Sequence, residues 1–204
     1  MTPDWIAPKR TALLLIDFQV DFASPDGAMG MRGADLDDVP AALAQAAKLA
    51  DAARAASVPV FFVRLTSRPG SESKVAREAS RRHGGEPPLC VDGTRGADFF
   101  GVRPKPGETV ISKSRFSAFA GTGLADLLHG QGIDTLVLAG LTTECCVAAS
   151  AWSAFEQDFH VVIAADACAA YEEDLHFSTL EALQLSGAML GETAEFAQIW
   201  KNYK

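Results

Sequence analysis

The sequence predicts an α/β fold in which helices cover both faces of a mostly parallel sheet. Short, continuous apolar runs alternate along the chain with longer segments whose apolar residues recur every three to four positions. Such continuous runs are typical of strands that are buried on both faces. Strands that alternate with helices in this way favour parallel pairing.

The elements follow from these periods, taken in chain order. The first strand, TALLLID, ends in a carboxylate, and the helix after the 18–33 loop begins with Asp, Val and Pro. Residues 66–106 have no regular period, and a connection of this length is usually a lid or a binding loop. The expected strands are 11–17, 58–65, 109–112, 134–139 and 159–164, with a possible last one at 188–191, and the expected helices are 37–56, 121–131, 145–157 and 173–185.

Length, charge and cysteine content exclude several classes of protein. A chain of 204 residues suits one domain, spanning 1–204, and a formal charge of −8 argues against nucleic acid or an anionic membrane as a partner. The apolar runs are too short to span a bilayer, and the N-terminal segment lacks a hydrophobic signal stretch. The four cysteines show no zinc spacing, and an adjacent pair makes a poor disulfide. We therefore expect reduced thiols and a cytoplasmic location.

The stretch 136–154, LVLAGLTTECCVAASAWSA, is the centre of the predicted site. A buried strand is followed by a turn, and the period then changes to that of a helix. Cys146 is thus expected in the first turn of a helix, where unpaired N–H groups and the helix dipole favour a thiolate. The alternative is a small, inert, buried thiol, which is a common fate of a free cysteine.

Three residue types that carry chemistry are predicted at one edge of the sheet. Ligands bind at the carboxyl ends of parallel strands, and Asp17, Lys113 and Cys146 all follow such ends. Taken singly, the aspartate is more often a turn residue and the lysine a solvated charge, so only their joint placement indicates a site. No histidine shares this edge, because His160 and His129 belong to the opposite edge, His176 to a helix and His83 to the long loop. Asp17 is therefore the best available base.

Three motifs, LLLIDFQVDF, VISKSRFSAF and GLTTECCVAASA, resemble the isochorismatase-like cysteine hydrolase family, and the resemblance covers nearly the whole chain. It implies a three-layer α/β/α sandwich around a six-stranded parallel sheet. It also implies a catalytic triad of Asp17, Lys113 and Cys146, since the family's nucleophile directly precedes Val, here Val147. A cis peptide before the nucleophile is implied as well, and it would fall at Leu141–Thr142.

The resemblance implies a mechanism of amide hydrolysis. Asp17 would take the thiol proton of Cys146, and Lys113 would stabilise the charges. The thiolate would attack a carbonyl carbon, with the backbone N–H groups of Thr142 and Cys146 as the oxyanion hole. Ammonia would leave, and water would hydrolyse the thioester.

Differences from the family's usual motifs narrow the range of expected reactions and substrates. Nicotinamidases bind a metal through an Asp-x-His segment, but here that segment reads Arg64-Leu65-Thr66, so we expect neither a metal nor another cofactor. Isochorismatases that cleave a vinyl ether do not need the cysteine, so its presence favours C–N hydrolysis. Many relatives have GTWGA where this chain has GTRGA, which places Arg95 at the position of a tryptophan. Arg95 is a candidate to bind a substrate carboxylate, and a solvated surface arginine is the alternative.

The expected substrate is a small, polar, anionic molecule with a terminal carbamoyl, ureido or amide group. Arginines around the long loop and the lysine contrast with the acidic chain, and Arg64, Arg82 and Arg115 are further candidates for the carboxylate. The phenylalanines near the motifs could instead belong to the core. The residues predicted to contact substrate are Gln19, Phe22, Arg95, Phe116, Phe119 and Leu141.

Two expectations concern other partners and other classes of function. A homo-oligomer, either a dimer or a tetramer, is suggested by the resemblance and by apolar residues at 196–200, which could instead cover the domain's own core. A redox-sensing thiol protein would use Cys145 and Cys146 without turnover and would not need Asp17 or Lys113. A vinyl-ether hydrolase of the isochorismatase type is the other alternative.

Overall fold

The computed structural model of the chain describes residues 3–82 and 84–203, so that His83 lies outside the described residues. A six-stranded parallel sheet with the strand order β3-β2-β1-β4-β5-β6 forms its centre, as predicted. The strands are β1 (Thr11–Ile16), β2 (Val60–Leu65), β3 (Thr109–Lys113), β4 (Thr135–Leu141), β5 (His160–Ala169) and β6 (Met189–Gly191).

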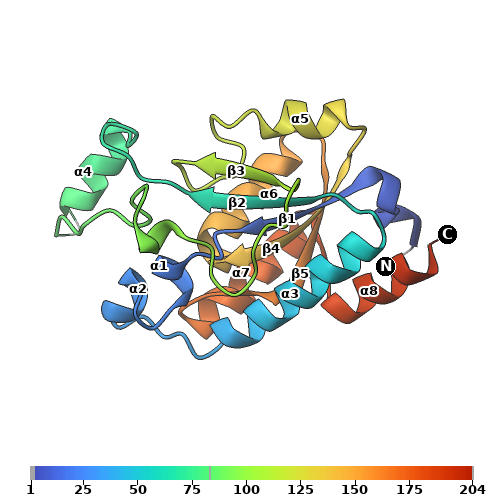
Figure 1. Cartoon of the computed structure of the whole chain (residues 1–204), viewed down its shortest axis with the longest axis horizontal. Helices are drawn as coiled ribbons and strands as arrows, with labels where there is room; N and C mark the ends of the chain where they lie inside the picture. Colours follow the sequence, from blue (N-terminus) through green and yellow to red (C-terminus); the bar gives the residue numbers. More distant parts are fainter. Residues whose placement is uncertain (1–2, 83, 204) are drawn as a thin grey trace.

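Helices cover both faces of this sheet and complete the α/β/α sandwich (Figure 1). One core lies beneath α3 (Val39–Ala55) and α8 (Thr193–Asn202). The second core lies beneath α5 (Leu124–Gly130), α6 (Ala148–Phe155) and α7 (Glu173–Leu185). No helix among the described residues is long and apolar enough to cross a membrane.

The two central strands explain the continuous apolar runs. Every residue of β1 and of β4 is buried, because each strand has a helix layer on both faces. The two strands pair in register from Thr11 opposite Thr135 to Ile16 opposite Gly140. A Cβ atom at Gly140, whose φ is 155°, would lie 2.3 Å from the carbonyl oxygen of Ile16. Only glycine therefore allows this close approach, which brings the loops after β1 and β4 together.

Several elements differ from the prediction. The loop 18–33 contains two one-turn helices, α1 (Val20–Ala23) and α2 (Ala28–Met31), which are too short to show a period. Within the long connection, α4 (Lys74–Arg82) projects from the body and has no buried residue (Figure 1). Short helices that bury little or no apolar surface are difficult to detect from the periodicity of hydrophobic residues. Strand β5 continues to Ala169, past the expected end, with an irregular register opposite Leu138 and Gly140.

The apolar residues at 196–200, which suggested an oligomer, lie on the C-terminal helix α8. Phe196 and Trp200 are 0% and 1% exposed, and the indole of Trp200 donates a hydrogen bond to the Ile6 carbonyl oxygen (2.9 Å). Tyr203 and Asp4 are also hydrogen-bonded, so the two ends of the chain lie side by side (Figure 1). The apolar residues at 196–200 thus cover the protein's own core, which was the alternative reading.

Candidate active site

Asp17, Lys113 and Cys146 meet at the carboxyl edge of the sheet. The Nζ atom of Lys113 lies 2.7 Å from Oδ2 of Asp17 and 3.3 Å from Sγ of Cys146. It also donates to the carbonyl oxygen of Arg115 at 3.0 Å, which gives each of its three hydrogen atoms an acceptor. The three residues are 0%, 2% and 6% exposed, so this arrangement is closed to solvent.

The lysine reaches the aspartate from two strands away. Lys113 ends the edge strand β3, opposite Leu65 of β2, and Asp17 follows β1 on the far side of β2. Neighbouring strands are about 4.8 Å apart, so the lysine side chain spans the end of the intervening strand. Asp17 has a φ of 55°, a left-handed conformation that ends β1 directly at the carboxylate.

Cys146 sits in a wide, π-type turn rather than in the first turn of a regular α-helix. The turn, η4 (Thr143–Val147), has π-type hydrogen bonding, and α6 begins only at Ala148. The hydroxyl of Ser150 accepts a bond from the Ala118 amide (2.9 Å) and donates to the Cys146 carbonyl oxygen (2.6 Å). One serine thus ties the cysteine turn to the segment that follows Lys113.

The protonation states are set by burial and by mutual charge. Burial raises the pKa of Asp17 above its ordinary value, and the positive charge of Lys113 opposes the rise only in part. Burial alone would lower the pKa of Lys113, but the negative charge of Asp17 and the hydrogen bonds to Asp17 and Cys146 hold it above its ordinary value. A carboxylate with a raised pKa is a better base, and an ammonium group beside it compensates its charge.

The surroundings of Cys146 oppose the thiolate that a helix start favours. Its pKa is raised, first by the neighbouring thiol of Cys145, then by burial and by the charge of Asp17, while Lys113 acts in the opposite direction. The pKa of Cys145, which is half-buried, is lowered. The neighbouring thiol, burial and the adjacent carboxylate oppose the effect of the helix start on which the expectation was based. Cys146 is therefore a thiol at rest, and its activation needs a base.

The turn before Cys146 combines a cis peptide with a buried carboxylate. A cis peptide joins Leu141 to Thr142, where the sequence placed it. The Thr142 hydroxyl donates to Oε1 of Glu144 at 2.6 Å, while Oε2 of Glu144 is buried without a hydrogen-bond partner among the described residues. The backbone N–H groups of Thr142 and Cys146 stay the predicted oxyanion donors.

Two residues near the turn were not expected at the site. The Thr143 hydroxyl and Nδ1 of His176 are 2.8 Å apart, so α7 holds the cysteine turn through a histidine that the sequence analysis assigned only to a helix. Burial raises the pKa of Tyr171, and the charge of Glu144 adds to the rise, while the phenol donates a hydrogen bond to the Phe22 carbonyl oxygen at 2.9 Å. Tyr171 belongs to the ADACAAYEEDLH segment, whose resemblance to the family could have drawn attention to it.

Gln19 has a structural role, which corrects its assignment as a substrate-binding residue. Its side chain is 0% exposed, and its amide makes three hydrogen bonds with the backbone. It accepts from the Leu65 N–H at 2.8 Å and donates to the carbonyl oxygens of Leu65 and Ala97 at 2.9 and 3.0 Å. Gln19 therefore joins the ends of β1 and β2 to the long connection that covers the site.

Arg95 is the solvated surface arginine that the sequence left as the alternative. Its guanidinium group is mostly exposed and pairs with Asp26 at 2.6 Å. This hydrogen bond and that of Ser24 hold the pKa of Asp26 at about 2. Arg82 is paired in the same way with Glu78 on the exposed helix α4. Neither arginine borders the buried site.

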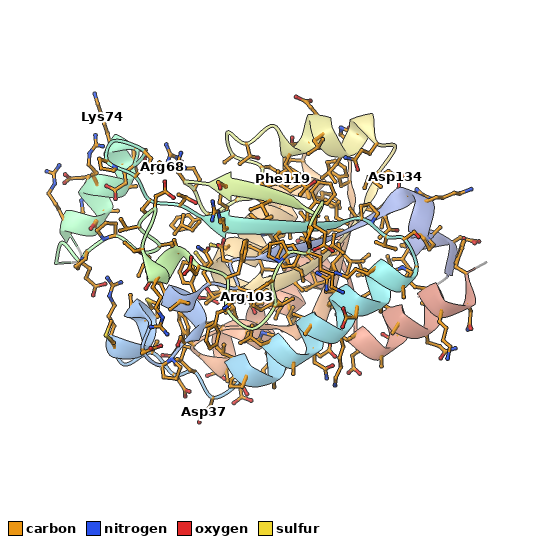
Figure 2. All side chains as sticks on the ribbon, in the orientation of Figure 1. Asp37, Arg68, Lys74, Arg103, Phe119 and Asp134 are labelled. Atoms are coloured by element: carbon orange, nitrogen blue, oxygen red, sulfur yellow. The ribbon has the colours of Figure 1, made fainter. Side chains whose placement is uncertain are left out.

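The apolar residues that were predicted to contact substrate lie partly in the core and partly at the surface. Phe119 is 8% exposed and packs against Phe159 between α5 and the sheet (Figure 2), and Leu141 is buried in the opposite core. Phe22 is half-buried on the core, and its carbonyl oxygen accepts a hydrogen bond from Tyr171. Phe116 is 68% exposed. Phe119, a candidate for an apolar wall of the site, and Leu141, predicted to contact substrate, both lie in the hydrophobic cores.

Two cavities border the carboxyl edge of the sheet. One, of about 160 Å³, is lined by Lys113 and by hydroxyl-bearing residues near the ends of β2 and β3. The other, of about 300 Å³, lies between α3, β5 and α7 and includes His176 in its wall. Among the residues described, no group of three or more His, Cys, Asp and Glu side chains is arranged to hold a metal ion.

The fold and the buried site define a class of protein: an α/β/α sandwich with a cysteine, a lysine and an aspartate joined at the carboxyl edge of a parallel sheet. The family model described as isochorismatase domain matches residues 11–195. The chain belongs to the isochorismatase family.

Two relatives with a named activity are amidohydrolases. A maleamate amidohydrolase from Pseudomonas putida is 35% identical over 162 residues, covering 76% of this chain and 70% of the relative. A ureidoacrylate amidohydrolase, RutB, from Agrobacterium fabrum is 29% identical, covering 79% and 76% of the two chains. The crystal structure of an isochorismatase family protein from Desulfovibrio vulgaris superposes with a TM-score of 0.80 at 32% identity, covering 95% of this chain and all of that one.

Proposed function

We propose that this protein is a cysteine hydrolase that cleaves the C–N bond of a small amide, ureido or carbamoyl substrate through a Cys146 thioester and releases ammonia. The observation that carries the proposal is the position of Lys113 Nζ, within 2.7 Å of Asp17 and 3.3 Å of Cys146. A buried base, a buried cation and a thiol in contact are what nucleophilic attack by a cysteine requires.

The first step is proton transfer from Cys146 to Asp17. Both groups have a raised pKa, so the thiol keeps its proton until a substrate arrives and the carboxylate is basic enough to take it. The ammonium group of Lys113 donates a hydrogen bond to Sγ and so stabilises the thiolate that forms. The thiolate then attacks the carbonyl carbon.

The tetrahedral intermediate carries a negative oxygen, which the backbone N–H groups of Thr142 and Cys146 would hold. One such donor is typically worth about 3–4 kcal/mol. Asp17 returns its proton to the leaving nitrogen, the C–N bond breaks and ammonia departs. Water then adds to the thioester, with Asp17 again as the base, and releases the acid and the free thiol.

The relatives support this reaction class. The maleamate and ureidoacrylate amidohydrolases are both named for hydrolysis of an amide bond in a small acid. The structure of a nicotinamidase from Bacillus subtilis also superposes on this chain, with a TM-score of 0.75 at 27% identity. Here Arg64-Leu65-Thr66 replaces the metal-binding segment of nicotinamidases, which favours hydrolysis without a metal.

The two alternative functions are vinyl-ether hydrolysis and redox sensing. Vinyl-ether hydrolysis is a known activity in the family, but it does not require the buried cysteine. A redox-sensing role is favoured by the adjacent thiols of Cys145 and Cys146, of which only the first is half-exposed. Neither function explains why a lysine and an aspartate are buried against Cys146.

The test is ammonia release from a panel of amides, ureido acids and carbamoyl acids. We expect at least one small acid with a terminal amide to be hydrolysed, and Cys146→Ala to show no release above background. Mass spectrometry of the stopped reaction should detect an acyl adduct on Cys146. Turnover of isochorismate without any amide activity, or full activity of Cys146→Ala, would overturn the proposal.

A further inference from the structure

Helix α4 is a basic arm without packing of its own. It projects from the body of the molecule (Figure 1), and none of its nine residues is buried. Four of the nine are basic and one is acidic, in a chain whose formal charge is −8. A helix shorter than about 12 residues is marginal in water, because most helical stability in proteins comes from the packing of one face. Contact with a second surface would therefore stabilise this arm.

The basic side chains of α4 are available for such a contact. Ala76 and Ser80 border a cavity of about 510 Å³ between the helix and the body, so they lie on its inner side. Lys74, Arg77 and Arg81 recur at i, i+3 and i+7 and form a stripe along the helix. Among the described residues, neither Lys74 nor Arg77 has a carboxylate within 4 Å. Figure 2 shows the Lys74 side chain pointing away from the body.

An acidic surface lies at the same end of the molecule. The starts of α3 and α7 meet there, at the cavity of about 300 Å³ whose wall contains three acidic residues and neither Lys nor Arg. Figure 2 labels Asp37 and Lys74 at this end, on opposite sides of it. No ion pair within the described part of the chain uses the exposed carboxylates of this surface, which are Asp35, Asp37, Asp38, Glu172, Glu173 and Asp174.

The acidic surface has an apolar floor. Five alanines line the cavity between the carboxylates, together with Phe177, which is 59% exposed. A groove with an apolar floor and charged edges is typical of a site for an amphipathic helix. On α4, Val75 is 78% exposed beside the basic stripe. Each surface thus offers apolar contact among charges of one sign, and the two signs are opposite.

We propose that α4 of one copy of this chain docks on the acidic surface of a second copy, which returns the same contact. The two complementary surfaces belong to one chain, yet no ion pair joins them within the described residues, so the arm does not satisfy its own acidic surface. Because both lie at one end of the molecule, a two-fold axis at that end places each arm on the other copy. Such an isologous contact is closed and uses both arms.

The contact is separate from any that is made through α6. The exposed apolar residues of that helix, Trp152 and Phe155, lie outside both the basic stripe and the acidic surface. Loss of the α4 contact should therefore halve the mass of the assembly. A dimer would become a monomer, and a tetramer would become a dimer that α6 holds together.

A charge exchange between two variants tests the pairing. The arm variant combines Lys74→Glu with Arg77→Glu, and the surface variant combines Asp38→Lys with Glu173→Lys. In a pure sample of either variant like charges meet, so light scattering at micromolar concentration should give half the wild-type mass. In an equimolar mixture both contacts of a mixed pair again join opposite charges, and the wild-type mass should return.

A matched control reverses two charges at the other end of the molecule. Lys9 and Lys201 are exposed, and they lie near the two chain termini, away from α4 (Figure 1). Lys9→Glu combined with Lys201→Glu changes the net charge as much as the arm variant does. This control should keep the wild-type mass.

Three results would overturn the proposal. These are a monomeric wild type, a wild-type mass in both pure variants, and a mixture that stays at half mass. The last result would show that the occupant of these surfaces is a different protein. All four reversed side chains are exposed, so the melting temperatures should stay near that of the wild type.

Neutral variants replace any reversed variant that fails to fold. Lys74→Gln with Arg77→Gln, or Asp38→Asn with Glu173→Gln, removes the attraction and adds no opposite charge. Each pair should weaken self-association about fivefold or more, measured by dilution in light scattering. Unchanged self-association in these variants would also overturn the proposal.

Discussion

The hydroxyl of Thr143 and Nδ1 of His176 are 2.8 Å apart, which joins helix α7 to the turn that carries Cys146. Thr143 is fully buried, and it lies between Thr142, a predicted oxyanion donor, and the cysteine. The contact therefore fixes the turn from the side opposite to Ser150, which bonds the Cys146 carbonyl oxygen. His176 acts on the site as a positioning residue, through Thr143.

Replacing this histidine should slow the reaction without abolishing it. A hydrogen bond of this kind is worth about 1 kcal/mol, so His176→Ala should lower kcat roughly fivefold and change KM little. His176→Gln, which keeps a hydrogen-bonding group, should recover part of the rate. Thr143→Val should add nothing to the loss in a double variant, and additive losses would show that the two side chains act separately.

The same histidine predicts a pH dependence of stability. Burial lowers the pKa of His176 in the folded protein, while the charges of Asp38, Glu144 and Glu173 oppose this shift. The unfolded chain therefore binds the proton more readily, and stability falls as pH decreases below about 6.5, the ordinary histidine value. Urea unfolding at pH 7.5 and 5.5 should show a smaller loss for His176→Gln than for the wild type. Equal losses would contradict this assignment.

Removing Lys113 should destabilise the fold as well as stop the reaction. Lys113→Met leaves the carboxylate of Asp17 buried without its partner at 2.7 Å, and breaking such a pair costs about 3–5 kcal/mol. Asp17→Asn combined with Lys113→Met should regain most of this stability, because no charge remains buried. Urea unfolding of the single and double variants measures the difference. A double variant as unstable as the sum of the single ones would contradict the prediction.

The sequence predicted the sheet well because the determining pattern is local. The apolar runs TALLLI and TLVLAGL predict that β1 and β4 are buried along their whole length. Asp17, Lys113 and Cys146 follow the ends of strands, and parallel pairing brings these ends to one edge of the sheet. Helix α4 was not predicted, because its segment is short, mostly charged and buries no residue.

Residues next to a motif were harder to assign, because sequence proximity does not tell where a side chain points. Gln19 and Phe119 lie near the site residues along the chain, yet one binds backbone and the other packs in the core. His176 and Tyr171 are distant in sequence from Cys146 and reach its turn only through the packing of α7 and the end of β5. The pKa of Cys146 likewise depends on neighbours that appear only in the folded chain.

Activity should not depend on a bound metal. The segment that holds a metal in nicotinamidases reads Arg64-Leu65-Thr66 here, and the Arg64 guanidinium group is hydrogen-bonded to Ser112 at 3.1 Å. Prolonged chelation followed by desalting should leave the rate of ammonia release unchanged. A loss of activity that zinc or iron restores would reverse the prediction.

A homo-oligomer stays a prediction, but its basis is now the surface of α6 and α7 instead of the segment 196–200. Trp152 and Phe155 of α6 and Leu185 of α7 are large apolar residues that are 42%, 49% and 82% exposed. Exposed large apolar residues on surface helices favour a contact between subunits. Light scattering at micromolar concentration should give a dimer or tetramer, and Trp152→Glu should dissociate it. A wild-type monomer would refute this expectation.

The two adjacent cysteines should differ in chemistry and in function. Cys145 is half-exposed and has a lowered pKa, whereas Cys146 is 6% exposed and has a raised pKa. Because the thiolate is the species that alkylates, iodoacetamide should label Cys145 first, contrary to the order expected from the helix start alone. Catalysis should nevertheless depend on Cys146, since only its Sγ accepts a hydrogen bond from Lys113 among the described cysteines.

Matched serine variants separate these two properties. Cys145→Ser should keep kcat within about threefold, because it removes neither the base nor the nucleophile, and Cys146→Ser should have no activity. In Cys145→Ser, inactivation by iodoacetamide reports on Cys146 alone, and it should be slower than the labelling of Cys145 in the wild type. Peptide mass spectrometry assigns the labelled thiol at each time point. An inactive Cys145→Ser, with Cys146→Ser still active, would exchange the roles of the two residues and remove Lys113 from the mechanism.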